Sequence, residues 1–429
     1  LPDPLRTTVL PLRRSLTTRG ASFVGAAVVL LACGILLGQP DVTRIGVLLL
    51  AMTAMGLVLV RRHGLRLQVV RTAVPSRIAI DERAVVTVRV RNGESTASPV
   101  VMAEESIDYA LGDRPRFLLR SLRPGETQEV QYTVRSHSRG VHRIGPLGVR
   151  VRDPFGLTLR TAALSGDAEV VVLPRVLPLP GARSLGSGIG SEGSVPHMVA
   201  LHGEDDQTVR EYRDGDDLRR IHWPASARTG ELMVRQEDRP GHRRAVVILD
   251  SRSTAHAGSG RASSLEWCVT MAASVTAHVV GAGYAVHLLT ADAGSDTGVR
   301  HDDSHEEGLE TLARVTLQSP ESLRAVLHAA SVLTSQGGLV VFIGGPIDDV
   351  DGRSLAALRQ PGSTGAAIVI DPASFDGHPR RGGGDDVASA SASVAALHSN
   401  GWLATVVDAQ TTASLAWGAV VGAQSVGTR

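Results

Sequence analysis

The sequence has no lysine, few cysteines and little aromatic content. All of its 44 basic residues are arginine, a bias that we attribute to genome composition and to which we give no functional weight. The two cysteines, Cys33 and Cys268, are too few and too far apart for a disulfide framework or a zinc site, which is compatible with a reducing compartment. Because 43 acidic residues leave a net charge of only +1, the chain lacks the basic excess of a nucleic-acid-binding protein. A disulfide-rich secreted domain and a nucleic-acid partner are therefore both excluded.

The length of 429 residues exceeds what one hydrophobic core normally supports, and predicts two or three folded units. An N-terminal segment, residues 1–19, precedes an uncharged apolar stretch. We expect a transmembrane hairpin over residues 20–62, with spans at about 20–38 and 45–60, each long enough to cross a bilayer.

Arginines flank this hairpin on its two outer ends, whereas the short connection between the spans carries only Arg44 and Asp41. The positive-inside rule then places both termini and the soluble domains in the cytoplasm, on the inner face of a bacterial plasma membrane, with the lipid bilayer as a partner. A cleaved signal peptide is the alternative. It is disfavoured because a second apolar span follows at once and residues 38–41 form no small-x-small cleavage site.

From residue 65 to residue 176 the apolar residues alternate with period two, which is typical of strands. The expected strands are 84–90, 129–135, 145–151 and 169–173, separated by turn sequences. Short strands at this spacing predict a β-rich domain, an antiparallel sandwich of the immunoglobulin-like kind. Residues 177–200 are rich in Gly, Pro and Ser and are expected to be a linker. Their glycine run lacks the Gly-Lys-Ser/Thr ending of a phosphate-binding loop.

A dense cluster of charged and aromatic residues follows within the segment 201–240. Its pattern Tyr-Arg-x-Gly-Asp-x-x-Arg-x-Ile-His-Trp, followed by Ala-Arg-Thr-Gly, resembles the signature of the DUF58 family. The residues that carry the resemblance are Tyr212, Arg213, Gly215, Asp216, Arg219, Ile221, His222, Trp223, Arg228, Thr229 and Gly230. One departure is Pro224, where relatives usually have a basic residue. We expect this proline to end a short helix that Asp216 caps.

The resemblance implies more than a motif. DUF58 proteins commonly combine a paired N-terminal span, a β-rich segment with an Asp-Pro-Phe-Gly turn (Asp153 to Gly156 here) and a von Willebrand A-like domain. The family is associated with MoxR-type AAA+ ATPases, often alongside transglutaminase-like membrane proteins. By this resemblance the chain is a scaffold or adaptor that acts with such an ATPase in the assembly or maturation of envelope or other complexes, and not an enzyme.

Two interpretations of the charged motif remain open. In the first it is an ion-pair network that joins domains or docks a partner. In the second it is a reactive site, most simply that of a hydrolase that uses His222 and the neighbouring acids. No nucleophile elbow, zinc motif or nucleotide loop accompanies His222, and the nearest hydroxyl is that of Ser226, so the first interpretation is favoured.

Residues 241–425 alternate buried strands with helices, which predicts a doubly wound α/β sheet of the von Willebrand A-like kind. We expect strands at 243–250, 284–290, 339–343, 366–370 and 403–407, and helices at 264–280, 322–333, 387–397 and 413–423. The first strand ends in Asp250, and this is where A-type domains carry an Asp-x-Ser-x-Ser metal site.

That metal site is degenerate here. Asp250 and Thr254 match, but Arg252 replaces the middle serine and brings a permanent positive charge. We therefore expect no metal and no cofactor, and an internal ion pair between Asp250 and Arg252. The polar run from His301 to Glu307 could suggest a second metal site, but it lies in a stretch without periodicity and is expected to be a solvated loop.

Overall fold

The computed structural model describes residues 16–62, 66–181, 208–211, 221, 223–236, 243–291, 297–299, 305–335, 337–376 and 383–426. The chain divides into two compact units. The first is Leu1–Arg175 with Leu312–Arg314, and the second is Val176–Thr311 with Val315–Arg429. Each unit is described by itself.

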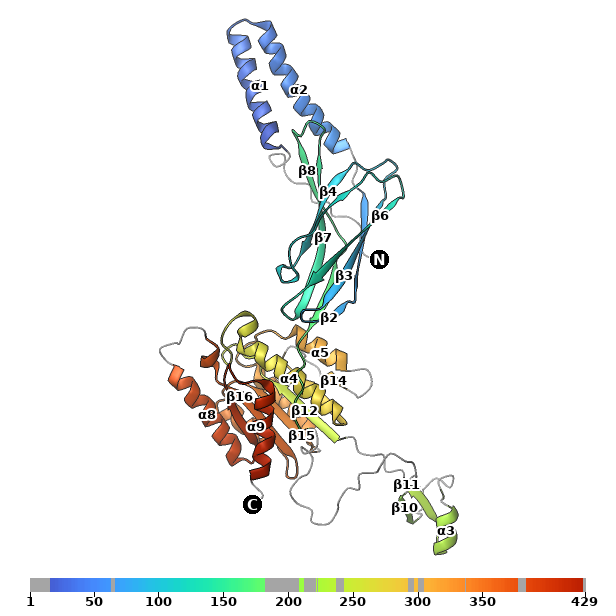
Figure 1. The fold of residues 1–429 in the computed structure, drawn as a ribbon, viewed down its shortest axis with the longest axis vertical. Coiled ribbons are helices and arrows are strands. Elements are labelled where there is room, and N and C mark those ends of the chain that lie inside the picture. The colour runs from blue at the N-terminus through green and yellow to red at the C-terminus, as the bar shows by residue number, and fades with distance from the viewer. Residues whose placement is uncertain are drawn as a thin grey trace. The chain divides into compact units, whose positions relative to one another are not determined.

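The first unit begins with a hairpin of two apolar helices, α1 (Thr18–Leu36) and α2 (Pro40–Arg62), which lie side by side (Figure 1). Both are long and apolar enough to cross a membrane. The second helix begins five residues before the expected span, at Pro40, because a proline lacks only an N–H that has no partner in the first turn of a helix. Asp41 follows, where a negative charge is favoured by the helix dipole.

Glycines allow these two helices to approach closely. A Cβ atom at Gly34 would lie 2.4 Å from the Thr43 hydroxyl oxygen, and one at Gly46 would lie 2.8 Å from Leu31 Cγ. Both distances are shorter than real Cβ contacts, so a larger residue at either position would force the helices apart. At Gly25, by contrast, a Cβ atom would meet nothing within 4 Å.

The strands of the first unit form two sheets. The first has the order β1-β3-β6 and the second the order β2-β9-β7-β4-β5, with β8 paired to β7. The strands are β1 (Leu67–Val74), β2 (Arg77–Ala79), β3 (Arg83–Asn92), β4 (Val101–Ile107), β5 (Arg116–Leu119), β6 (Thr127–Arg135), β7 (Gly140–Arg152), β8 (Leu159–Leu164) and β9 (Ala168–Leu173). Most pairs are antiparallel, and β2 with β9 is parallel. The four strands expected in this region correspond to β3, β6, β7 and β9.

One hydrophobic cluster joins the two sheets. In β3 every second residue is buried, so that Ala84, Val86, Val88 and Val90 face inward. They share the cluster with Ile144, Leu147 and Val149 of β7 and with Val170 and Val172 of β9. The period-two pattern of the sequence is therefore the pattern of burial.

An ion pair lies inside this unit, between Arg71 of β1 and Glu105 of β4. The Arg71 guanidinium donates to both carboxylate oxygens over 2.9 to 3.2 Å, and both side chains are 0% exposed. Burial raises the pKa of Glu105, against the opposing effect of Arg71. The Nη1 atom of Arg71 is buried without a hydrogen-bond partner.

The second unit is built on a six-stranded sheet of order β14-β13-β12-β15-β16-β17. Its strands are β12 (Arg243–Leu249), β13 (Tyr284–Leu289), β14 (Thr297–Val299), β15 (Leu339–Gly344), β16 (Thr364–Ile370) and β17 (Leu403–Val407). All pairs are parallel except the edge pair of β13 with β14. Residues 339 to 344 of β15 are buried without alternation, as expected of a parallel strand covered on both faces.

Helices cover both faces of this sheet (Figure 1). They are α4 (Ser264–Gly281), α6 (Ser322–Thr334), α7 (Asp349–Ala357), α8 (Gly383–Ser399) and α9 (Ala413–Val426), and a further helix, α5 (His305–Arg314), precedes α6 in the chain. Helices α6, α7 and α8 share one core with the sheet, around Phe342, while α4 and α9 pack against the strands of the other face. The helices α5 and α7 and the edge strand β14 were not expected from the sequence.

In the chain, a small ββα element comes between β9 and β12. Strands β10 (Thr208–Glu211) and β11 (Met233–Gln236) pair antiparallel, and α3 (Trp223–Thr229) precedes β11. The Ser226 hydroxyl accepts a hydrogen bond from the Met233 N–H at 2.8 Å, which ties α3 to the strand.

Candidate functional site

The ββα element carries part of the charged motif. Ile221 is buried and Trp223 is 67% exposed, and the side chains of Arg228 and Thr229 are exposed with Gly230 at the end of α3. The other residues singled out from the sequence, Tyr212, Arg213, Gly215, Asp216, Arg219 and His222, lie outside the described residues. The interpretation of the motif as a docking surface therefore stays a prediction.

The expectation for Pro224 was wrong. This proline does not end a helix but is the second residue of α3, which runs on to Thr229. Proline is tolerated there because the N–H groups of the first helical turn have no intrahelical acceptor. From the sequence, we expected Pro224 to follow the last turn of a helix. In the structure the helix begins at Trp223, one residue before the proline.

A second site lies at the carboxyl edge of the six-stranded sheet. Counted along the chain, the parallel strands have the order 2-1-3-4-5, so the connections run in opposite directions from β12 and from β15. Ligand and partner sites of open α/β sheets usually lie at such a switch point. Asp250 follows β12 here, and Gly344 ends β15 beside it, followed by Gly345 and Pro346.

The glycines at the end of β15 make room for the loop after β12. A Cβ atom at Gly344 would lie 2.3 Å from Asp250 Cβ, and one at Gly345 would lie 2.3 Å from the Ala255 carbonyl oxygen. Only glycine permits such close backbone approach. The two strand ends are therefore held against each other, and the Asp250 side chain is enclosed.

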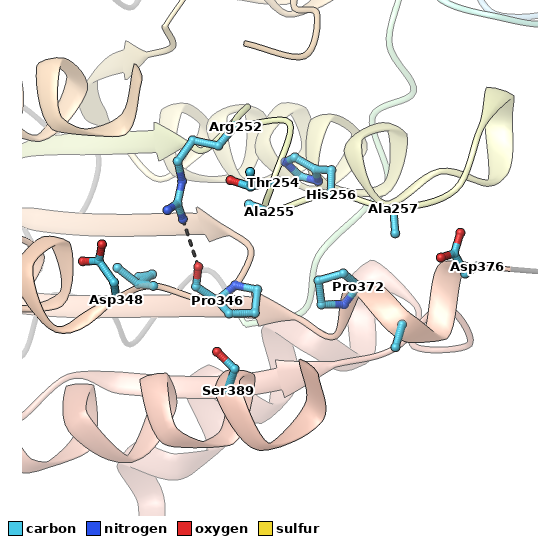
Figure 2. Close-up of a pocket in the computed structure, with 12 residues that line it drawn as sticks. Arg252, Thr254, Ala255, His256, Ala257, Pro346, Asp348, Pro372, Asp376 and Ser389 are labelled. Atoms are coloured by element: carbon cyan, nitrogen blue, oxygen red, sulfur yellow. Dashed lines mark hydrogen bonds between the residues drawn. The ribbon is translucent and has the colours of Figure 1, made fainter. Parts of the chain in front are cut away.

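Arg252 and Asp250 form a buried, bidentate ion pair. Arg252 Nε donates to Asp250 Oδ1 at 3.0 Å and Nη2 donates to Oδ2 at 2.8 Å. Nη2 also donates to the Pro346 carbonyl oxygen at 3.0 Å, as the dashed line in Figure 2 shows. Burial opposes the charged form, but Asp250 outweighs it and the pKa of Arg252 is raised. The ion pair expected from the sequence is present.

A second carboxylate faces the same guanidinium. Asp351 Oδ2, from the first turn of α7, lies 3.9 Å from Arg252 Nη1, and Asp351 also accepts from Arg324 at 3.2 Å. The Arg252 guanidinium therefore stands between two buried carboxylates. Sequence reasoning missed Asp351. The available signal was Asp348, whose side chain caps α7 and thereby places residue 351 in its first turn.

His256 and Ser264 also meet at this edge. His256 Nε2 lies 2.8 Å from the Asp250 carbonyl oxygen and therefore carries the proton, so Nδ1 accepts from the Ser264 hydroxyl at 3.0 Å. The Ser264 oxygen in turn accepts from the Ala257 N–H at 2.9 Å. Burial lowers the pKa of His256, which favours this neutral form.

A serine hydroxyl that donates to a histidine can be a nucleophile with its base. Ser264, however, is 0% exposed and is not among the residues that line the neighbouring cavity. The histidine has no acid on its other nitrogen, only a backbone carbonyl. These bonds therefore fix the loop between β12 and α4, and supply no accessible nucleophile.

A cavity of about 360 Å³ opens beside this loop. Arg252, Thr254 and His256 line one wall, and Pro346, Asp348, Pro372, Asp376 and Ser389 face them (Figure 2). The walls come from the loops after β12, β15 and β16 and from α8. Polar side chains such as Thr254, Asp348 and Ser389 and the apolar rings of Pro346 and Pro372 share this lining.

The prediction of a solvated loop from His301 to Glu307 was wrong for the last three of these residues. His305, Glu306 and Glu307 are not a loop but the first turn of α5, where acidic side chains are favoured by the helix dipole. Residues 301–304 lie outside the described residues.

Comparison with protein families identifies the central segment. Residues 208–375 match the model of DUF58, a family of proteins of unknown function. Over these residues the chain belongs to the DUF58 family. The match covers the ββα element and the sheet up to the residues after β16, and so includes both the charged motif and the Asp250–Arg252 pair. No curated protein matches the sequence.

Solved structures resemble parts of this DUF58 protein only weakly. A solution structure of the CARDB domain of a Pyrococcus furiosus protein is 19% identical, covers 25% of this chain and 93% of that chain, and has a TM-score of 0.19. A crystal structure of the same domain with di-metal ions is 20% identical over 23% of this chain and 86% of that chain, with a TM-score of 0.17. An alkylpurine DNA glycosylase of Pseudomonas fluorescens bound to DNA is 15% identical over 29% of this chain and 38% of that chain, with a TM-score of 0.17. Likenesses at this level carry no functional argument.

Proposed function

We propose that this DUF58 protein is a membrane-anchored scaffold or adaptor without catalytic activity of its own. The observation that carries the proposal is the Arg252 guanidinium, which stands between Asp250 and Asp351 at the sheet edge. In this proposal the guanidinium is a fixed internal charge that neutralises the two carboxylates. The loops around it are then the surface that contacts another protein. The buried Ser264 supports the same conclusion, because it offers no accessible nucleophile.

The two soluble parts are proposed to be an immunoglobulin-like β-sandwich and a von Willebrand A-like domain. The core that joins the two sheets of the first unit supports the former. The strand order and the helices on both faces of the second sheet support the latter. In this proposal the A-like domain has lost its metal and retains docking through its sheet edge.

The anchor is the hairpin of α1 and α2. Its two apolar helices support insertion in the bacterial plasma membrane. The arginines outside the two helices, among them Arg19 and Arg61, support a topology with both termini and both soluble domains in the cytoplasm.

The proposed partner is a MoxR-type AAA+ ATPase, with a transglutaminase-like membrane protein as a further candidate. This part of the proposal rests on the family association. The exposed Trp223 on α3 supports a role of the charged motif in docking, because exposed aromatic side chains are enriched at binding surfaces.

A pulldown from solubilised membranes tests the proposal. The tagged full-length chain is compared with an Arg219→Ala, His222→Ala variant, and the retained proteins are identified by mass spectrometry. A matched control, Arg143→Ala with His328→Ala, removes the same two side-chain types from exposed positions outside the motif. Circular dichroism shows that each variant is folded.

We expect the parent and the control to retain a MoxR-type ATPase, and the motif variant to lose it. An ATPase that is absent from the parent would overturn the partnership. An ATPase that the folded motif variant retains would overturn the role of the motif as the docking surface.

A further inference from the structure

The turn between β7 and β8 joins the β-rich part of the first unit to the apolar hairpin. The Thr17 hydroxyl, at the start of α1, donates to the Gly156 carbonyl oxygen at 2.7 Å, and the Thr17 N–H donates to the Leu157 carbonyl oxygen at 2.9 Å. On the other helix, Gly56 lies against Asp153, since a Cβ atom there would be 3.0 Å from Asp153 Oδ2. Both helices of the hairpin therefore hold the same turn.

These contacts set the depth of the turn along the helices. Gly56 precedes Arg61 by between one and two helical turns, and thus lies within the apolar part of α2. Thr17 stands just before Arg19 at the outer end of α1. If the arginines mark the headgroup level of a bilayer that holds the hairpin, the turn lies at that level or slightly deeper.

The carboxylate of the turn has its hydrogen-bond partners within the turn. The buried Asp153 carboxylate accepts from the Phe155 N–H at 3.0 Å, from the Thr158 N–H and from the Thr158 hydroxyl. A backbone segment close to the hydrocarbon region needs such internal partners, because lipid tails offer none.

Phe155 is the aromatic side chain of this turn, and it is exposed, as is the neighbouring Pro154. Phe155 is 50% exposed, whereas Asp153 and Leu157 are 4% and 2% exposed. An aromatic ring at the outer end of an apolar hairpin is well placed for the boundary between headgroups and acyl chains, where such rings act as anchors.

We propose that Phe155 inserts into this boundary of the bilayer that holds α1 and α2, so that the turn from Asp153 to Thr158 is a lipid contact of the β-rich part. The inference rests on the membrane anchoring proposed above. It adds to that anchoring a contact outside the hairpin, which orients the neighbouring sheet with respect to the membrane surface.

Spin labels on single cysteines measure the depth of this contact in the full-length chain, reconstituted in phosphatidylcholine and phosphatidylglycerol vesicles. Cys33 is exposed on α1 and is first replaced by alanine. Cys268 is kept, because it is buried and burial raises the pKa of its thiol, so that it stays unreactive in the folded protein. The labelled variants are Phe155→Cys, Leu48→Cys and Tyr109→Cys.

Leu48 and Tyr109 supply the two references. Leu48 is 58% exposed on α2 and reports insertion of the hairpin. Tyr109 is 92% exposed and follows the end of β4 that lies away from the turn, because Met102 pairs with Arg150 and Ile107 pairs with Ile144. It is therefore an exposed aromatic position at the opposite end of the same sheets.

We expect the ratio of oxygen accessibility to nickel-chelate accessibility to be several-fold higher at position 155 than at position 109, and highest at position 48. Phe155→Trp should likewise be quenched by brominated lipids more strongly than Tyr109→Trp. Labels at 155 and 109 that are equally open to the chelate, with a label at 48 in lipid, would overturn the lipid contact alone. A label at 48 that is open to the chelate would overturn the anchoring, and the lipid contact with it.

Discussion

Arg71 and Arg252 each bind a buried carboxylate, but the first pair lies inside a β-rich core and the second at the end of a parallel sheet. Arg71 and Glu105 come from neighbouring regions of two sheets, and neither side chain has any exposed surface. Arg252 and Asp250 are two residues apart in one loop, beside a cavity. The two pairs have similar distances and different surroundings.

The surroundings decide what each pair can do. In the core, Nη1 of Arg71 has no hydrogen-bond partner, so the pair is buried at a cost that only its mutual attraction offsets. At the sheet edge, the Arg252 guanidinium has Asp250, the Pro346 carbonyl and Asp351 around it. The first pair thus lies between two sheets of one core, whereas the second lies at a sheet edge, where in the function proposed above it takes the place of a cation.

The largest expected effect is that of Arg71→Met. It leaves Glu105 buried without its partner, which should lower the free energy of unfolding of the first unit by about 3–5 kcal/mol. Urea denaturation followed by circular dichroism and by hydrogen exchange in β1 and β4 measures the change. Because all four tryptophans follow residue 175, their fluorescence provides an internal control that the second unit is unchanged.

Two further variants test the reason for this effect. Adding Glu105→Leu to Arg71→Met should recover much of the loss, because no buried charge then remains. Arg89→Met, which breaks the exposed pair with Glu129, should leave stability within the error of the measurement. An Arg71→Met protein as stable as its parent would contradict the expectation that loss of the core pair is the more destabilising of the two.

A smaller loss is expected for Arg252→Met in the second unit. Asp250 keeps the hydrogen bond from the Arg252 N–H at 3.0 Å, so that its charge is not wholly unpaired. The free energy of unfolding should fall by about 1.5–3 kcal/mol, the range for hydrogen bonds to a charged group. Tryptophan fluorescence in urea reports it. A loss larger than that of Arg71→Met would contradict the comparison.

Arg252→Ser tests whether the guanidinium stands in for a cation. This variant removes the positive charge and supplies a hydroxyl, so that Asp250, Thr254 and the new side chain offer hard oxygen ligands. We expect Mn²⁺ at roughly ten to thirty times its dissociation constant to stabilise the variant by about 1–2 kcal/mol and to leave the parent unchanged. Equal responses of both proteins to Mn²⁺ in thermal unfolding would refute the replacement.

The smallest expected effect is a pH dependence of the second unit. Because burial depresses the pKa of His256 below its ordinary 6.5, the unfolded chain binds the proton more readily than the folded chain. The contribution of this group to stability is present above pH 6.5 and is lost as the pH falls through the folded value.

The dependence of stability on pH is measured from urea midpoints, followed by tryptophan fluorescence, between about pH 7.5 and 5.5. Histidine normally titrates in this range. His256→Gln should flatten this dependence. Some slope should remain, because burial also lowers the pKa of His278. A slope identical in parent and variant would show that His256 is not the group concerned.

The elements that the sequence predicted are those in which local pattern and burial coincide. Strand β3 alternates in sequence as it does in burial, and β15 is an unbroken apolar run that is buried throughout. Strand β4 was missed because Glu104 and Glu105 interrupt its apolar residues. Only the partner Arg71, far away in the sequence, explains why an acid can face the core, and pairing between sheets cannot be read from a single segment.

The site shows the same division. The ion pair of Asp250 with Arg252 could be predicted because the two residues are close in the chain and one replaces a ligand in a known pattern. Asp351 and Ser264 reach the same edge from α7 and α4, and their approach depends on how those helices pack. No sequence spacing relates either residue to Asp250. The second carboxylate, Asp351, and the hydrogen bond between Ser264 and His256 were therefore found only in the structure.

The glycines of the apolar hairpin constrain how this part of the chain can evolve. Hydrophobicity alone would allow any small apolar residue along α1 and α2, and lineages could exchange Gly25 for alanine without penalty. At Gly20, however, a Cβ atom would lie 2.0 Å from the Leu157 carbonyl oxygen, and Cβ atoms at Gly34 and Gly46 would lie 2.4 and 2.8 Å from atoms of the opposite helix. Among diverging descendants of this hairpin, these three positions should therefore remain glycine while the apolar residues around them drift freely.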